Sequence, residues 1–194
     1  TSVEMKIYPI AETRIFQAYT FPSTHDGLNA IRNFIHKGLR PAVVRLYDEV
    51  EAVPKISSYG FEKGFVLLIL VFEGNKEMSE LEAGMTKEIC LGNNGRYKGE
   101  LAAREWLETR FSTKKMLDFD AIKGGTADAI EVAAPWDCIE NVWREMRKAL
   151  EPMCTVVDCH FSHVYHNGAS VYVIYHAKTC LLYTSDAADD MQCV

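Results

Sequence analysis

The sequence predicts an α+β fold in which one unit, a strand, a helix and two further strands, occurs twice around a mostly antiparallel sheet. Short apolar runs of strand length alternate with longer segments in which apolar residues recur every three or four positions, as they do on one face of a helix. Two of these helical segments begin directly after an apolar strand, at Phe21-Pro22 and at Ala134-Pro135. Hydrophobic residues make up 48% of the 194 residues, which is ample for a packed core.

The first unit occupies residues 15–91. Ser23 is expected to cap its first helix, with Asp26 three residues later as in a capping box, and Gly38 is expected to end that helix. The predicted apolar stripe of the helix is Leu28, Ile31 and Ile35. The predicted elements are strands at 15–21, 43–47 and 65–72 and helices at 23–38 and 75–91.

The second unit repeats this order after a loop at 95–99, a helix at 100–111 and a break at Gly124-Gly125. Its predicted elements are a strand at 129–133, a helix at 135–150, and strands at 155–165 and 170–177. Helix 75–91 has no counterpart in the second unit. We therefore expect a duplicated ferredoxin-like domain that is truncated and whose helices cover one face of the sheet.

The two ends of the chain differ in character from its middle. Residues 2–8 alternate between apolar and charged side chains, which predicts a half-buried strand. Residues 180–194 lose apolar periodicity, and the run 180–189 resembles translated sequencing-adapter sequence. We expect residues 180–194 to be a non-native tail and the chain to be truncated at both ends.

Charge, apolar run length and cysteine spacing each limit the class of protein and its location. There are 21 Lys and Arg residues against 27 Asp and Glu, giving a net charge of −6, which argues against binding to nucleic acid or anionic lipid. The longest apolar run, residues 65–72, is too short to span a bilayer. The six cysteines form no C-x-x-C pair and are expected to be buried free thiols in a reducing, cytoplasmic compartment.

A histidine-rich hairpin is the strongest candidate for chemistry. Read as a two-residue turn, Asn167-Gly168 places His163 opposite Tyr172, with Tyr165 on the same face and His160 on the other. This split of the histidines between two faces argues against a metal site. A phenol beside an imidazole can transfer protons, although the same pair can also be a cross-strand contact that only stabilises the sheet.

Two arginines are candidates for binding an anion. Arg45 lies in an otherwise apolar strand, where a guanidinium group is costly unless it pairs with Asp48 or with an anionic ligand. Arg110 follows Trp106 at the end of a helix. There it is either a solvated cation favoured by the helix dipole or a ligand for an anionic substrate.

Four collinear segments resemble a known family. They are Gly38–Asp48, Ala103–Phe111, Glu131–Asp137 and Ser162–Tyr172. They are similar to the C-terminal cap, or substrate, domain of FAD-linked oxidases of the vanillyl-alcohol-oxidase superfamily, in the branch of alkyldihydroxyacetonephosphate synthase and bacterial FAD-binding oxidases. The resemblance implies that residues 1–9 are the last strand of an otherwise missing FAD-binding domain and that 10–179 are the cap, which leaves 180–194 as the tail that the composition indicates.

The resemblance also implies roles for particular residues. Tyr172 falls on the catalytic tyrosine, with His163 beside it. Arg110 and Arg45 fall on residues that hold the substrate, and Tyr165 is expected to line the same site. Thr1 falls close to the flavin.

The implied enzyme is an FAD-dependent oxidase, dehydrogenase or transferase that acts on a small anionic oxygenated substrate. Its reaction is either oxidation of a 2-hydroxy acid or the chemistry of alkyl-glycerone-phosphate synthesis. The chain is expected to be inactive without its own FAD-binding domain, and a homodimer is left open. Two alternatives remain: a free-standing duplicated ferredoxin-like module that binds a small molecule or a partner without catalysis, and a structural oligomerisation domain.

Overall fold

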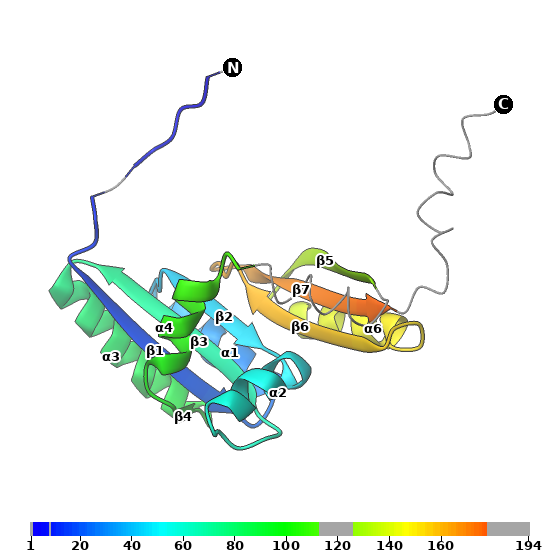
Figure 1. The fold of residues 1–194 in the computed structure, drawn as a ribbon. Coiled ribbons are helices and arrows are strands. Elements are labelled where there is room, and N and C mark those ends of the chain that lie inside the picture. The colour runs from blue at the N-terminus through cyan, green and yellow to red at the C-terminus, as the bar shows by residue number, and fades with distance from the viewer. Residues whose placement is uncertain (1, 8, 113–125, 178–194) are drawn as a thin grey trace.

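The computed structural model describes residues 2–7, 9–112 and 126–177, which form an antiparallel seven-stranded sheet and five helices (Figure 1). The sheet order is β4-β1-β3-β2-β6-β7-β5. The elements are β1 (Thr13–Phe21), α1 (Thr24–His36), β2 (Val43–Tyr47), α2 (Glu49–Ser58), β3 (Val66–Gly74), α3 (Lys76–Gly92), β4 (Arg96–Tyr97), α4 (Leu101–Thr109), β5 (Thr126–Pro135), α6 (Ile139–Leu150), β6 (Val156–Ser162) and β7 (Gly168–Ala177). None of the described helices combines the length and the apolar character needed to cross a bilayer.

The strand order confirms the predicted duplication. In each unit the third strand lies between the first and the second, as β1-β3-β2 in one half and as β5-β7-β6 in the other. The two halves meet edge to edge where β2 pairs with β6, through Leu46 with Phe161 and Tyr47 with His160. The counterpart of α3 would follow Ala177, outside the described residues.

The first helix forms for the reasons that its sequence suggests. Ser23 has an extended backbone, and its hydroxyl oxygen accepts a hydrogen bond from the Asp26 backbone N–H at 3.1 Å. Leu28 and Ile31 are buried, whereas Ile35 is partly buried against the same core. Gly38 follows the helix with φ at +85°, a conformation that glycine adopts without strain.

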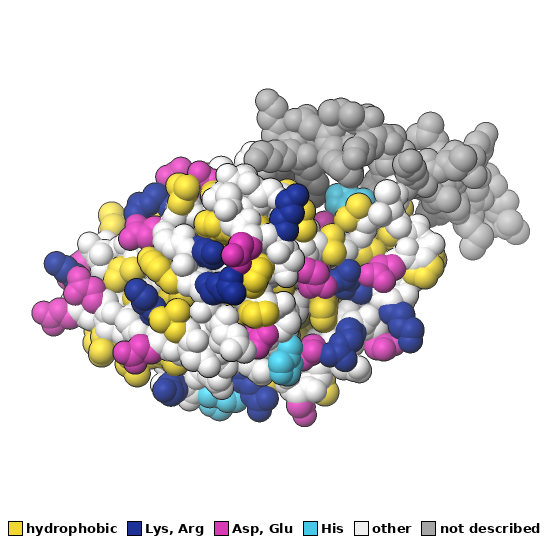
Figure 2. Space-filling view, turned by 90° about the horizontal axis from the view of Figure 1, so that it is seen from below, with side chains coloured by type: hydrophobic (Ala, Val, Ile, Leu, Met, Phe, Trp, Pro, Cys, Tyr) yellow, Lys and Arg dark blue, Asp and Glu magenta, His cyan; other side chains and the backbone are white. Residues whose placement is uncertain are grey.

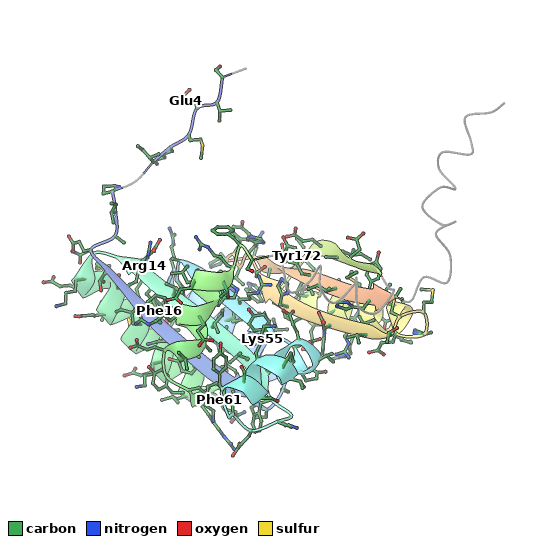
Figure 3. The ribbon with its side chains drawn as sticks, in the orientation of Figure 1. Glu4, Arg14, Phe16, Lys55, Phe61 and Tyr172 are labelled. Carbon is green, nitrogen blue, oxygen red and sulfur yellow. The ribbon has the colours of Figure 1, made fainter. Side chains whose placement is uncertain are left out.

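Two apolar cores lie on opposite faces of the sheet, so the expectation of helices on one face holds only for part of it. Helices α1, α3 and α6 pack on one face, around residues such as Phe34, Phe72 and Phe161. Helices α2 and α4 cover the other face, over β1, β2 and β3, where Phe16 lies beside α4 (Figures 1 and 3). Within the described residues, no helix covers this second face over β5 and β7.

Helix α2 is an element that the sequence pattern did not reveal. It begins after Asp48, a fully buried residue whose carboxylate accepts hydrogen bonds from the Val50 and Glu51 backbone N–H groups. It also contains Pro54, which lacks the N–H that an interior helical residue normally donates. The helix packs through Ala52 and Ile56 and brings acidic side chains toward β6.

The predicted strand at 2–8 is wrong for the described residues 2–7, which form no regular secondary structure. Val3, Met5 and Ile7 are 77–87% exposed, and the segment extends away from the sheet (Figure 1). An alternating pattern forms a strand only where a neighbouring strand takes its backbone hydrogen bonds, and no described strand pairs with it here. Gly124-Gly125 and the predicted tail at 180–194 lie outside the described residues.

The surface carries charges of both signs. On the face seen in Figure 2, lysine and arginine side chains are interspersed with aspartate and glutamate, and neither sign forms a continuous field.

Candidate functional site

A cavity of about 570 Å³ opens where the two halves of the sheet meet. Its walls include all five of the described residues that the sequence singled out, namely Arg45, Arg110, His163, Tyr165 and Tyr172. Trp106, His160 and Ser162 add further aromatic and polar groups to the lining. Thr1, the remaining predicted residue, lies outside the described residues.

The hairpin between β6 and β7 has a different register from the predicted one. Tyr172 pairs with His160, three residues before the expected partner His163. His163 instead begins a longer loop and has a left-handed backbone, with φ at +49°. His160 therefore lies on the same face as Tyr172, whereas it was expected on the opposite face.

Gly168 explains why the two-residue turn was misleading. A side chain at this position would lie 2.2 Å from the carbonyl oxygen of Ala134, because β5 passes directly against it. The glycine is thus required by close strand packing within β7, and the turn is made by the residues before it, with the Tyr165 N–H donating to the Gly168 carbonyl at 2.8 Å. The indole N–H of Trp136 lies 3.1 Å from the carbonyl oxygens of Tyr165 and His166, which anchors this loop beside the cavity.

A row of four register partners crosses the centre of the site. Tyr47 on β2 pairs with His160 on β6, His160 pairs with Tyr172 on β7, and Tyr172 pairs with Glu131 on β5. Side chains directly opposite one another in an antiparallel sheet are close enough to interact. Figure 3 shows Tyr172 near the junction of the two halves.

The hydroxyl group of Tyr172 interacts with Glu131. This hydrogen bond raises the pKa of Tyr172, with smaller contributions from burial and from the negative charge of the carboxylate. The pKa of Glu131 is lowered by the same hydrogen bond. His163 lies beside both groups, with Nδ1 3.4 Å from the carboxylate of Glu131 and its ring centroid 6.0 Å from that of Tyr172. At neutral pH the phenol therefore keeps its proton and donates it in a hydrogen bond.

Arg45 is held between aromatic rings. Its guanidinium carbon lies 5.3 Å from the ring centroid of Tyr47 and 5.9 Å from that of Trp106. Its Nε atom is buried and has no hydrogen-bond partner among the described residues. The suggested partner Asp48 instead caps α2 and lies 3.3 Å from a guanidinium nitrogen of Arg147. The buried N–H of Arg45 is therefore a donor for which a ligand could supply the acceptor.

Arg110 reaches the same cavity from a different element. It is the exposed C-cap residue of α4, and its guanidinium carbon lies 5.9 Å from the ring centroid of Trp106. Trp106 therefore lies beside both arginines, which bring two positive charges to the wall of the cavity.

Two further residues at the site were missed by the sequence analysis. His160 and Glu51 are both nearly buried, and His160 Nδ1 lies 2.8 Å from a carboxylate oxygen of Glu51. Glu51 escaped notice because the pattern did not predict α2, and His160 because the assumed hairpin register turned it away. Glu131 lies in the family-like segment Glu131–Asp137, but nothing in the sequence pattern points to a role for its carboxylate.

Among the described residues, no cluster of three or more His, Cys, Asp or Glu side chains could hold a metal ion. The glycine-rich loops that cradle the phosphates of dinucleotides are also absent from the sequence. The donors at the cavity are guanidinium, phenol and imidazole groups, which suit a small anionic molecule with an oxygen to be protonated or deprotonated.

Comparison with known proteins identifies relatives for nearly the whole chain. The family model for the C-terminal domain of FAD-linked oxidases matches residues 10–187. An uncharacterized FAD-linked oxidoreductase from Escherichia coli K12, YgcU, is 25% identical over 194 aligned residues, covering 90% of this chain and 38% of the relative. Alkyldihydroxyacetonephosphate synthase from Dictyostelium discoideum is 21% identical, covering 92% of this chain and 34% of the relative.

Solved structures show the same fold at low sequence identity. An alkyldihydroxyacetonephosphate synthase superposes with a TM-score of 0.78 at 20% identity, over 92% of this chain and 38% of that one. The 4-ethylphenol oxidase from Gulosibacter chungangensis superposes with a TM-score of 0.67 at 11% identity, over 89% of this chain and 41% of that one. The chain thus spans less than half of the length of the proteins that it matches.

Proposed function

Because this chain belongs to the FAD-linked oxidases through their C-terminal domain, we propose that it forms the substrate-binding and catalytic cap of a flavoenzyme that acts on a small anionic oxygenated substrate. The FAD-binding part of that enzyme would lie outside the printed sequence. The reaction would be oxidation of a 2-hydroxy acid or chemistry of the alkyl-glycerone-phosphate synthesis type, the second in keeping with the name of one relative.

One observation carries this proposal. Guanidinium groups from β2 and α4 line the same cavity as phenol and imidazole groups from the β6–β7 hairpin. A site of about 570 Å³ that brings cations together with proton-transfer groups suits a substrate that has a carboxylate or phosphate near an alcohol or ketone oxygen.

The described residues are better suited to binding a substrate beside a flavin than to binding FAD itself. They offer a buried donor on Arg45 and a phenolic hydroxyl on Tyr172, but no glycine-rich phosphate loop. The flavin, when bound by the rest of the enzyme, would supply the electron acceptor. The residues of this chain would bind the substrate, orient it and handle its proton.

In this proposal Arg45 and Arg110 hold the anionic group of the substrate. Arg45 is fixed between two rings and loses little freedom on binding, whereas the exposed Arg110 reaches the same cavity from the end of α4. Tyr172 and His163 face the reacting oxygen. The phenol of Tyr172 would turn its single hydrogen from Glu131 to the reacting oxygen when substrate is bound, and the neighbouring imidazole of His163 is the acceptor of the substrate proton.

The proposal is tested with the complete enzyme expressed from the full gene. Anaerobic addition of small 2-hydroxy acids should bleach the flavin absorbance, and the matching alcohols without the carboxylate should not, since they lack the group that the arginines bind. A parallel assay follows exchange of the acyl group of an acyl ketone phosphate for a long-chain alcohol. If neither reaction occurs, and the complete protein contains no flavin, the chain is a binding module without catalysis.

A further inference from the structure

Glu51 and His160 form a buried pair at the wall of the cavity, which His160 itself lines. Their side chains are only 11% and 5% exposed, and His160 Nδ1 is 2.8 Å from a carboxylate oxygen of Glu51. Glu51 comes from the first turn of α2 and His160 from the middle of β6, so two elements far apart in the sequence are joined at this point.

The shorter of the two polar contacts at Nδ1 indicates which nitrogen of His160 carries the proton. A carboxylate can only accept a hydrogen bond, so Nδ1 is the protonated nitrogen and Nε2 is the acceptor. Burial lowers the pKa of His160 more than Glu51 raises it, and the ring is neutral. Burial alone would raise the pKa of Glu51, but the hydrogen bond with His160 and the charges of Lys55 and Arg45 lower it to about 2. The pair is therefore an ionised carboxylate with a neutral imidazole.

The fixed imidazole ring packs against the phenol ring of Tyr172. The two rings are nearly parallel, at 14°, with centroids 5.0 Å apart. The imidazole also packs against Tyr47 in a T-shaped arrangement, with the two ring centroids 6.1 Å apart. Tyr172 is thus confined by the ring of His160 on one side and by the carboxylate of Glu131 on the other. Arg45 Nη2 also lies 3.2 Å from Nδ1, but a guanidinium group only donates, so with the proton on Nδ1 this is a contact between two donors and not a hydrogen bond; the shorter contact, with Glu51 at 2.8 Å, is the hydrogen bond.

We propose that Glu51 and His160 are positioning residues: Glu51 holds His160 as the Nδ1–H tautomer, and the ring so fixed holds Tyr172 in its place at the cavity. This inference rests on the proposed function for the role of Tyr172. Apolar side chains of the same size would fill this space with a smaller desolvation cost than an ionised carboxylate. What the polar pair adds is one defined orientation of the imidazole ring.

The first test needs no substitution, so no effect of a variant on folding can confuse its result. In a long-range ¹H–¹⁵N NMR spectrum of the ¹⁵N-histidine-labelled protein at neutral pH, His160 should show a neutral ring with at least about nine tenths of the Nδ1–H tautomer, since only that tautomer can donate to Glu51. The acid- and urea-unfolded chain supplies the reference shifts. A majority of the Nε2–H tautomer, or a doubly protonated ring, would overturn the proposal.

The second test compares Glu51→Gln with Glu108→Gln, a control that removes the same charge from an exposed position on α4. A glutamine can present either its oxygen or its NH₂ group to the ring, so the Nδ1–H tautomer of His160 should fall to about half. The aromatic resonances of Tyr172 should shift and broaden in Glu51→Gln but not in the control. A folded Glu51→Gln chain with unchanged Tyr172 resonances would contradict the positioning role.

The third test uses the complete enzyme and truncates the side chain of His160. His160→Ala should lower kcat about tenfold and leave KM within about twofold, because the substrate still binds but the phenol is no longer held. Imidazole added to the buffer should restore part of kcat through the adjoining cavity, and this rescue is not expected if the substitution only destabilises the fold. If the NMR results hold but the enzyme has no flavin activity, the proposed function fails and the positioning of Tyr172 stands.

Discussion

The Tyr172 hydroxyl group acts in a setting that favours its protonated form. Its hydrogen bond to Glu131 raises the pKa of the phenol, and neighbouring strands confine the ring. A phenol in this state is a donor rather than a base, so the acceptor of a substrate proton has to be another group. His163, exposed at the rim of the cavity and close to Glu131, meets this requirement.

Replacing Tyr172 by Phe should therefore remove the donor and keep the ring. In the complete enzyme we expect flavin to remain bound and kcat/KM to fall by roughly 10²- to 10⁴-fold, the range of general acid–base catalysis. Flavin absorbance and steady-state kinetics measure the two properties separately. Tyr175→Phe, on the opposite face of β7, is the control. Activity equal to that of the wild type in Tyr172→Phe would make this residue a structural cross-strand partner.

Two exposed arginines allow a matched comparison: Arg104 lies within α4, and Arg110 caps its C-terminal end. Arg110 lines the cavity, whereas Arg104 forms an ion pair with Glu100 one turn away. Arg110→Lys should raise KM for an anionic substrate about tenfold with little change in kcat, because an ammonium group replaces a two-pronged donor. Arg104→Lys should leave both constants unchanged. Equal kinetics for the two variants would argue that Arg110 is a solvated helix-end cation.

At the scale of single elements, periodicity predicted most of the structure. Helix α1 begins at its Ser23 cap, and strands β1, β2 and β3 lie close to their predicted bounds, since these segments carry regular apolar patterns that the final packing uses. Helix α2 was missed because its ten residues include Pro54 and several polar side chains. It forms because buried Asp48 caps its first turn, a contribution that depends on tertiary contacts.

The hairpin register could not be obtained from local sequence either. Asn167-Gly168 is a strong turn signal, but here the glycine is required by the backbone of β5, a strand more than thirty residues away. A register shift by an odd number of residues moves every side chain to the opposite face. The prediction thus identified Tyr172 and His163 as neighbours while assigning His160 to the wrong side.

Strand β6 carries a carboxylate whose ionisation opposes folding. The pKa of Asp158 is raised from 3.8 to about 7 by burial and by the negative charges of Glu51 and Asp48. Because the folded-state pKa is the higher one, the folded protein binds more protons than the unfolded chain between these values. The free energy of unfolding therefore falls as pH rises through this window.

We expect Asp158→Asn to raise the free energy of unfolding by about 2 kcal/mol near pH 8 and by almost nothing below about pH 4, where the aspartic acid is already neutral. Urea unfolding at the two pH values measures the difference. Asp128→Asn, at an exposed position on β5, is the control for loss of one charge. An effect of Asp158→Asn that is the same at both pH values would contradict the ionisation argument.

At the scale of the whole molecule, the two repeated units contribute different chemistry to one cavity. The first unit and α4 supply Arg45, Trp106 and Arg110, whereas the second supplies His163 and Tyr172. The duplication itself was readable in the sequence because both units keep the same order of apolar segments. The meeting of their functional side chains at the β2–β6 junction was not, since no local pattern specifies which strand edges join.

The chain alone should bind no flavin in stoichiometric amounts. The described residues contain no phosphate-cradling loop, and the proteins that the chain matches are more than twice as long. Absorbance of the purified 194-residue chain near 450 nm after incubation with excess FAD and gel filtration provides the measurement. The complete enzyme, stripped of its flavin and carried through the same steps, is the positive control. A yellow one-to-one complex would show that the cap holds the cofactor by itself.

The pairing of β2 with β6 also affects the solubility of the protein. A single ferredoxin-like unit would leave β2 as an open edge, with unpaired N–H and C=O groups available to any other strand and therefore prone to aggregation. Joining two copies at this edge covers both strands at once. In the described sheet the outer strands are then β4, with two residues, and β5, which carries Asp128, Glu131 and Pro135. Short strands, charges and proline all discourage edge-to-edge association. The junction that creates the cavity therefore also covers the strand edges through which the units could pair with other chains.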